Sequence, residues 1–160
     1  MPLQIQQIGV PELIAEVVGL FKPLAHEKGI EVKTQIENDL PFLVADESRV
    51  RQVLHNLLAN AVGHTHRAET VALSVQHDGN HLSIDVLDSG DGIDRRHPPH
   101  LFDRFYRADK SRNRDRGGTG LGLATANTII ESHGGQIHAY SEGIDHGSRF
   151  SIRLPISPPG

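Results

Sequence analysis

Residues 47–64, ESRVRQVLHNLLANAVGH, carry the strongest helical pattern of the chain. The apolar residues of this stretch recur at intervals of three and four, namely Val50, Val53, Leu54, Leu57, Leu58, Ala61 and Val62. This spacing places them on one helix face, which packs against a core. Asn56 and Asn60 are four residues apart, so their carboxamides project from the same side of the helix, beside the apolar face.

Helices and strands alternate on both sides of this segment. Pro11 and Gly29 are typical of the first helical position and of the residue just past a helix end, whereas Pro23 between them indicates a kink. Alternation of apolar and polar residues predicts strands elsewhere, two of them joined by a turn at 78–80. We predict helices over 11–28, 47–64 and 119–133, and strands over 30–36, 42–45, 70–76, 81–88, 136–141 and 148–154. This order predicts an α/β fold with one sheet covered by one layer of helices.

The composition is that of a single globular domain, and we expect residues 1–160 to form one, with its core over about 9–155. The chain has 160 residues and no cysteine, which excludes disulfides and thiolate sites. Its net charge of -4 disfavours broad binding of nucleic acid. No apolar run is long enough to span a bilayer, and no signal peptide opens the chain. The eleven histidines supply no zinc ligand set within one motif.

An Asp-x-Gly-x-Gly motif, DSGDGI at 88–93, follows the strand expected over 81–88. Strand parity puts Asp88 on the same face as Leu82, Ile84 and Val86, which we expect to be the face under the helices. A buried carboxylate needs hydrogen-bond donors, and the exocyclic amine of a purine would be one. The alternative is a tight turn in which the aspartate caps the backbone.

A second glycine-rich motif, GGTGLGL at 117–123, runs into the helix expected over 119–133. Glycines there expose the amides of the first turn, and the helix dipole favours anions, so the motif suits phosphate; the alternative is a flexible hinge. Between the motifs lies a basic stretch with Arg104, Arg107, Lys110, Arg112, Arg114 and Arg116. It is either a lid whose cations meet phosphates or a solvated loop.

The asparagine pair completes this set. Carboxamide oxygens are hard neutral ligands that suit magnesium, which takes its other ligands from water and phosphates. The alternative is that Asn56 and Asn60 bond to a neighbouring loop. Taken together, the metal ligands, the base reader, the phosphate cradle and the cationic lid favour a site for a magnesium nucleotide.

The arrangement resembles the catalytic ATP-binding domain of sensor histidine kinases, in the superfamily of the gyrase B subunit, MutL and a heat-shock chaperone. Residues 51–65 resemble its N box, 88–93 its first glycine box, 101–107 its F box and 117–123 its second glycine box, and 147–148 open its closing strand. The resemblance implies a Bergerat-type fold. This is a two-layer sandwich in which three helices cover a mixed, mainly antiparallel sheet of about five strands, with an ATP lid.

The resemblance also implies roles for single residues. Asn56 and Asn60 would hold Mg2+, mainly Asn60, and Asp88 would bond the adenine amino group with help from Ser148. The catalytic residues would be Asn56, Asn60, Arg107 and Arg112. The ATP-binding residues would be Asn60, His64, Asp88, Gly90, Gly92, Ile93, Phe102, Arg107, Lys110, Arg112, Gly118, Thr119, Gly120, Leu121, Gly122, Leu123 and Ser148.

Three positions qualify this resemblance. The related ATPases place a glutamate base four residues before the magnesium asparagine; here that residue is Asn56, which suits a kinase that keeps the γ-phosphate for a protein acceptor. Gly63 stands where the family usually has a lysine that reaches a phosphate, so phosphate binding should be weaker. His26 lacks the proline that follows the family's acceptor histidine, so we expect the chain to bind ATP without phosphorylating itself.

The implied function is donation of the γ-phosphate to a histidine on a separate dimerisation domain. The other expected partner is a response regulator. The domain itself would be monomeric and cytoplasmic, with the full-length protein anchored in the inner membrane. Three alternatives stay open: a degenerate nucleotide-binding docking module, which Gly63 favours; a serine kinase of related fold, against which the F box and the lid argue; and a mechanical ATPase, which Asn56 opposes.

Overall fold

A computed structural model of the chain describes residues 3–65, 69–89, 120–140 and 148–157. In chain order the elements are β1 (Ile5–Ile8), α1 (Val10–Glu27), β2 (Glu31–Ile36), β3 (Leu43–Asp46), α2 (Glu47–His64), β4 (Thr70–Asp78), β5 (His81–Asp88), α4 (Gly120–Ser132), β6 (Gln136–Tyr140) and β7 (Ser148–Pro155). Every helix and strand predicted from the sequence is therefore present, with ends that differ by one or two residues. None of the described helices is long and apolar enough to cross a membrane.

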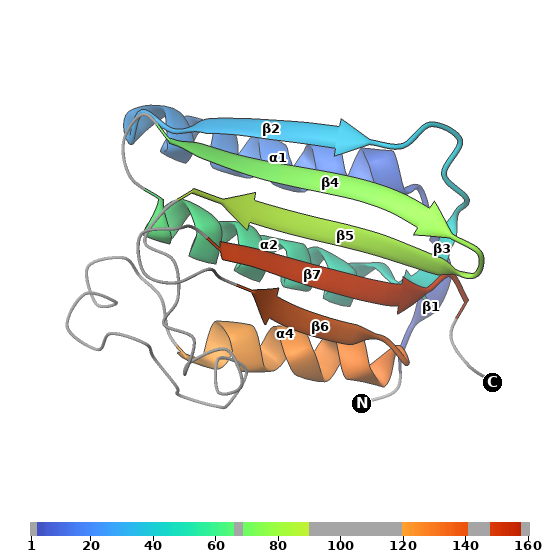
Figure 1. Cartoon of the computed structure of the whole chain (residues 1–160). Helices are drawn as coiled ribbons and strands as arrows, with labels where there is room; N and C mark the ends of the chain where they lie inside the picture. Colours follow the sequence, from blue (N-terminus) through green and yellow to red (C-terminus); the bar gives the residue numbers. More distant parts are fainter. Residues whose placement is uncertain (1–2, 66–68, 90–119, 141–147, 158–160) are drawn as a thin grey trace.

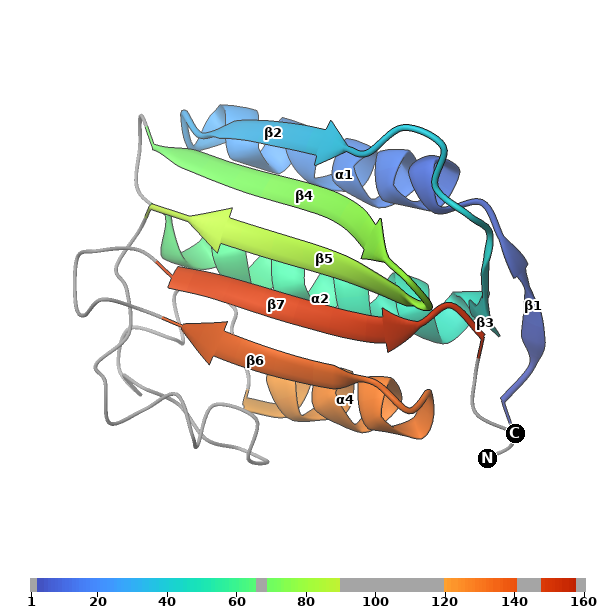
Figure 2. The ribbon, with the colours of Figure 1, turned by 45° about the vertical axis from the view of Figure 1, so that its right-hand side comes forward.

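The main sheet has five strands in the order β2-β4-β5-β7-β6. β2 pairs with β4 in parallel, and every other pair is antiparallel. The three described helices lie on one face of this sheet (Figures 1 and 2). The predicted two-layer α/β sandwich with a mixed, mainly antiparallel sheet is thus confirmed.

Helix α2 lies at the centre of the helical layer. Its predicted apolar face is buried throughout, from Val50 at 2% exposed to Leu57 and Leu58 at 0%. The inward side chains of the sheet complete the core, among them Leu73 and Ile84. The helical period of the sequence therefore fixes which side of α2 faces the sheet, and the two asparagines lie at the edge of that side.

Helix α1 continues through Pro23 as one helix of 18 residues. Its buried face extends to both sides of the proline, with Val18 and Phe21 before it and Ala25 after it. Packing of this face on the core therefore outweighs the hydrogen bond that the proline removes. The helix ends where the sequence predicts, because Gly29 adopts φ 71° and allows the amide of the next residue to bond back to Ala25.

Strand β1 was not predicted. It pairs antiparallel with β3 in a separate two-stranded sheet at one end of the domain (Figure 2). The sequence IQQI is too short to show alternation, and only Ile8 is buried in it. Its strand conformation depends on pairing with residues about 40 positions away, which a local pattern does not reveal.

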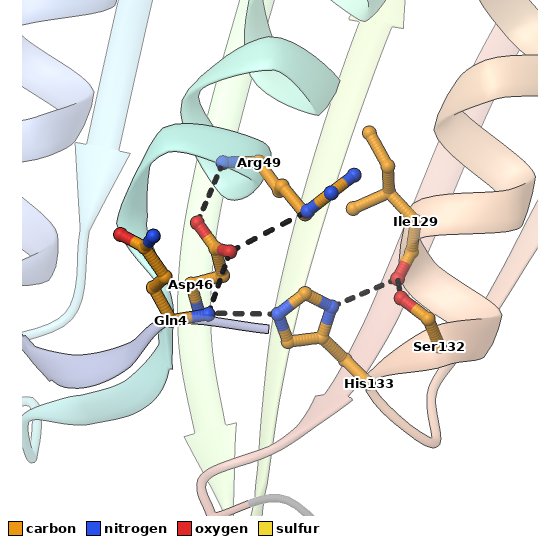
Figure 3. Close-up of polar contacts among 6 residues, drawn as sticks. All are labelled: Gln4, Asp46, Arg49, Ile129, Ser132 and His133. Atoms are coloured by element: carbon orange, nitrogen blue, oxygen red, sulfur yellow. Dashed lines mark hydrogen bonds and ion pairs between the residues drawn. The ribbon is translucent and has the colours of Figure 1, made fainter. Parts of the chain in front are cut away.

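A buried polar network joins the start of α2 to the end of α4 (Figure 3). His133 is 2% exposed. Its Nε2 lies 3.2 Å from the backbone amide of Asp46, and its Nδ1 lies 2.8 Å from the carbonyl of Ile129. The amide can only donate and the carbonyl can only accept. In this arrangement Nε2 of His133 accepts the amide of Asp46 and Nδ1 donates to the carbonyl of Ile129.

The carboxylate of Asp46 is the charged member of this network. It accepts the backbone N–H groups of Gln4 and Arg49, at 3.0 and 3.3 Å, and so caps the first turn of α2. The bond from Gln4 lowers the pKa of Asp46 most, and the Arg49 amide and guanidinium act in the same direction against burial. The folded state therefore favours the ionised carboxylate.

We expect Asp46→Ala to lower the free energy of unfolding at pH 7 by about 1–2 kcal/mol, because it removes this cap. Since the pKa of Asp46 is depressed in the folded state, its contribution is complete above the ordinary aspartate pKa of about 3.9 and is lost as pH falls through the folded value. Urea unfolding should therefore show the variant and the wild type converging toward pH 3. Asp78→Ala, at an exposed hairpin position, is the control. An equal deficit at both pH values would contradict the role of the charge.

Candidate functional site

The predicted site residues that the structure describes lie at one end of the domain. β5 ends there at Asp88, β7 begins there at Ser148, α4 begins there at Gly120, and α2 ends there at His64 (left in Figure 1). The antiparallel order brings the end of β5 beside the start of β7. Segments 60 residues apart along the chain therefore contribute to one place.

Asp88 is buried, with 7% of its surface exposed. It lies on the inward face of β5 with Leu82, Ile84 and Val86, as strand parity predicts. It pairs in register with Ser148, whose hydroxyl donates to its Oδ2 at 2.6 Å. An ionised carboxylate can accept about four hydrogen bonds, so this bond is compatible with a further donor. The site therefore contains a buried acceptor held in position by a neighbouring strand.

Asn56 joins α2 to the first turn of α4. Its Nδ2 donates to the carbonyl oxygen of Gly122 at 3.0 Å. A Cβ added at Gly122 would lie 4.0 Å from the Asn56 side chain, so the two helices approach closely at this point. The partner of this nitrogen is thus a helix backbone and not the loop of the alternative prediction. The oxygen Oδ1 is the atom that a cation would use.

Asn60 lies one turn further along α2 and is half-buried, like Asn56. Among the described residues, no group of three or more His, Asp or Glu could hold a metal ion. Asn56 and Asn60 supply two amide oxygens from the second half of α2. A cation held by two neutral oxygens needs water or phosphate for its other ligands, which is the usual coordination of magnesium. The donor set therefore fits Mg2+ together with a phosphate ligand.

The start of α4 is at Gly120, one residue after the predicted position. Leu123 is partly buried against the core. His64, Gly120 and Leu121 are described only as parts of their helices. The remaining predicted site residues lie outside the described ranges: Gly90, Gly92, Ile93, Phe102, Arg107, Lys110, Arg112, Gly118 and Thr119.

Two side chains at the end of α2 were missed by the sequence analysis. Lys28 donates through Nζ to the carbonyl of Val62 at 2.6 Å, and Thr65 donates through Oγ1 to the carbonyl of Ala61 at 2.7 Å. Thr65 follows the helix directly, so its capping role could have been considered. The lysine is 34 residues from its acceptor, and no local pattern predicts such a pair.

A shallow pocket at the opposite end of the domain does not suit a triphosphate. Its lining includes Glu12, Glu16 and Glu47, and the single cation in it is Arg51. Arg51 is already paired with Glu16 and lies near Glu47. The excess of carboxylates would repel phosphate, so this pocket is not a candidate nucleotide site.

Comparison with known proteins identifies relatives of the chain. The family described as histidine kinase-, DNA gyrase B- and HSP90-like ATPase matches residues 45–158. The sensor protein CzcS of Cupriavidus metallidurans is 33% identical over 155 residues, which cover 97% of this chain. The match covers 32% of CzcS, so the chain spans about a third of that relative.

Solved structures share the fold over nearly the whole chain. The nucleotide-free catalytic domain of the histidine kinase ThkA is 27% identical, with a TM-score of 0.86 and 98% of each chain covered. Full-length ShkA in complex with AMPPNP is 31% identical, with a TM-score of 0.87, and the match covers all of this chain and 33% of that one. ThkA in complex with the response regulator TrrA is 26% identical, with a TM-score of 0.80, and the match covers 96% of this chain and 42% of ThkA. The resemblance stated from the sequence motifs is thus confirmed.

Proposed function

Because the chain belongs to the family of histidine kinase-, DNA gyrase B- and HSP90-like ATPases, we propose that it binds magnesium ATP and donates the γ-phosphate to a histidine on a separate dimerisation domain. The observation that carries the proposal is the buried Asp88–Ser148 pair. It lies at the same end of the domain as the asparagines of α2 and the start of α4.

In this proposal Asp88 accepts a hydrogen bond from the adenine amino group. A buried carboxylate bonds a neutral amine donor more strongly than a neutral acceptor does. Ser148 keeps the carboxylate in place, and Gly90, Gly92 and Ile93 would line the base pocket. The close approach of backbone to a flat ring requires the small residues of this motif.

The phosphates are proposed to extend from the base toward α2 and α4. Asn56 and Asn60 would hold the magnesium ion through their amide oxygens. Magnesium, when bound, neutralises phosphate charge and polarises the group that is transferred. Gly118, Thr119 and the first turn of α4 would receive phosphate oxygens through backbone amides. His64, Phe102, Arg107, Lys110 and Arg112 would complete the site, with the arginines opposite the developing charge.

The environment of Asn56 favours a kinase over a hydrolase. Its nitrogen is bonded to the Gly122 carbonyl, and a carboxamide cannot take a proton from water. No base is therefore proposed at this position, and the γ-phosphate is kept for a protein acceptor. Transfer would depend on positioning and charge neutralisation.

The proposed partners are a dimerisation domain that carries the acceptor histidine and a response regulator. The relative ThkA has been solved in complex with the regulator TrrA, which supports the second partner. We propose that residues 1–160 act as one monomeric domain with its core over about 9–155. The domain would work in the cytoplasm, where ATP is abundant, within a longer protein anchored in the inner membrane.

The test is a calorimetric titration of magnesium ATP into the chain, followed by incubation with a separately produced dimerisation hairpin. We expect saturable one-to-one binding, acid-labile phosphate on the hairpin, and no appreciable phosphate on the chain itself. Acid-stable product would favour the serine kinase, and turnover without an acceptor would favour the mechanical ATPase. Absence of binding would contradict the proposal and favour the docking module that Gly63 suggests.

A further inference from the structure

The C-terminal turn of α2 is held by two side chains from outside the helix. The last carbonyls of any α-helix have no partner within it. Here the carbonyl of Ala61 accepts from Thr65 Oγ1 at 2.7 Å, and the carbonyl of Val62 accepts from Lys28 Nζ at 2.6 Å. Asn60, the proposed magnesium ligand, immediately precedes these two residues.

The position of Lys28 is itself fixed. Lys28 is the C-cap of α1, and its amide bonds the carbonyl of Leu24 at 3.2 Å. The following residue, Gly29, adopts φ 71° and bonds back to His26, which closes the end of α1. The ammonium group therefore extends from a rigid backbone to the neighbouring helix.

The last turn of α2, which Lys28 contacts, contains a residue that is unfavourable in a helix. Gly63 lies within it, and glycine inside a helix is less favourable than alanine by about 1 kcal/mol. A cation at the C-terminus of a helix interacts favourably with its dipole. A hydrogen bond from a charged donor is also stronger than one from a neutral donor. Lys28 therefore offsets the weakness that Gly63 introduces.

We propose that Lys28 is a positioning residue for the nucleotide site, which fixes the last turn of α2 and thereby the carboxamide of Asn60. The lysine does not touch the nucleotide in this proposal. It acts through the backbone of Val62. It also places a cation at this end of α2, where Gly63 stands in place of the lysine that is usual in the family. The inference rests on the proposed function, because it assigns the metal to Asn60.

The experiment compares Lys28→Met with wild type by titrating ATP into the chain with excess magnesium and again in EDTA. We expect the Kd for magnesium ATP to rise about fivefold. The Kd for ATP in EDTA should stay within about twofold, since no metal then joins Asn60 to the phosphates. Lys28→Arg, which keeps a cationic donor, should recover most of the affinity. Lys22→Met, at an exposed position of the same helix, should match wild type.

Hydrogen exchange of the amides at 60–65 gives a second readout, which is independent of nucleotide. It should be faster in Lys28→Met, while exchange in β5 stays unchanged. Equal weakening of ATP binding with and without magnesium would show a general structural contact and overturn the proposal. Unchanged magnesium-ATP binding in Lys28→Met would also overturn it, while leaving the proposed function intact. Failure of the wild type to bind would refute the proposed function and the role of Lys28 with it.

Discussion

Asp88→Asn is expected to raise the Kd for magnesium ATP by at least about 100-fold, which corresponds to about 3 kcal/mol. Asp88 is 7% exposed and accepts the hydroxyl of Ser148. Asparagine can still accept that hydroxyl through its oxygen, but it then turns an amide N–H toward the adenine amine. The substitution removes a charged acceptor and places two hydrogen-bond donors opposite each other in a buried site. Both changes oppose nucleotide binding.

The matched control for this substitution is Asp85→Asn. Asp85 lies on the same strand, but its side chain points to the opposite face of the sheet from Asp88. The change of charge and shape is identical, so an effect confined to Asp88 is an effect of the site. Calorimetric titration measures the binding, and circular dichroism checks that both variants are folded. Binding by folded Asp88→Asn within about threefold of wild type would contradict the proposed adenine contact.

Ser148 gives a graded form of the same experiment. Ser148→Ala removes the donor that holds the carboxylate but leaves the carboxylate itself, so we expect a smaller rise in Kd than for Asp88→Asn. The order wild type, Ser148→Ala, Asp88→Asn in increasing Kd would support the view that serine orients and aspartate binds. The reverse order would assign the base contact to the serine.

The burial of Asp88 could be predicted from the sequence because strand alternation is local. Three apolar residues two positions apart define the inward face of β5, and Asp88 continues their series. The apolar face of α2 is likewise a local pattern with the helical period. The inward faces of β5 and α2 were therefore predicted correctly. These faces decide which polar side chains enter the site.

Contacts that depend on distant parts of the chain could not be predicted. The partner of Asn56 is 66 residues away, at Gly122, and the nitrogen of His133 that meets Asp46 is 87 residues away. β1 is a strand only because β3 lies beside it. In each case the sequence indicates a polar or short apolar segment, while the fold decides what that segment meets.

Gly135→Ala is expected to lower the free energy of unfolding by about 3 kcal/mol, which should lower the melting temperature by about 10 °C. Gly135 lies between the end of α4 and the start of β6, and its amide bonds the carbonyl of Ile130. A Cβ at this position would lie 2.4 Å from the backbone oxygen of Arg153. That oxygen belongs to β7, which pairs with strands on both sides and cannot move alone.

Side chains also surround the added carbon, so moving it away from the Arg153 oxygen would bring it against them. The added carbon would lie 3.0 Å from Ile130 and 3.1 Å from Leu154, and both of these residues are buried in the core. The backbone of α4 or β7 therefore has to shift, which strains packing at the end of β7 opposite Ser148.

Gly19→Ala is the control with the opposite expected sign. Gly19 lies inside α1, and a Cβ there meets no atom within 4 Å. Alanine should therefore raise the free energy of unfolding by about 0.5–1 kcal/mol through helix propensity and a less flexible unfolded chain. Thermal and urea unfolding of the two variants separate steric exclusion from the general effect of replacing glycine. A Gly135→Ala variant as stable as Gly19→Ala would show that α4 and β7 do not approach as closely as the structure describes.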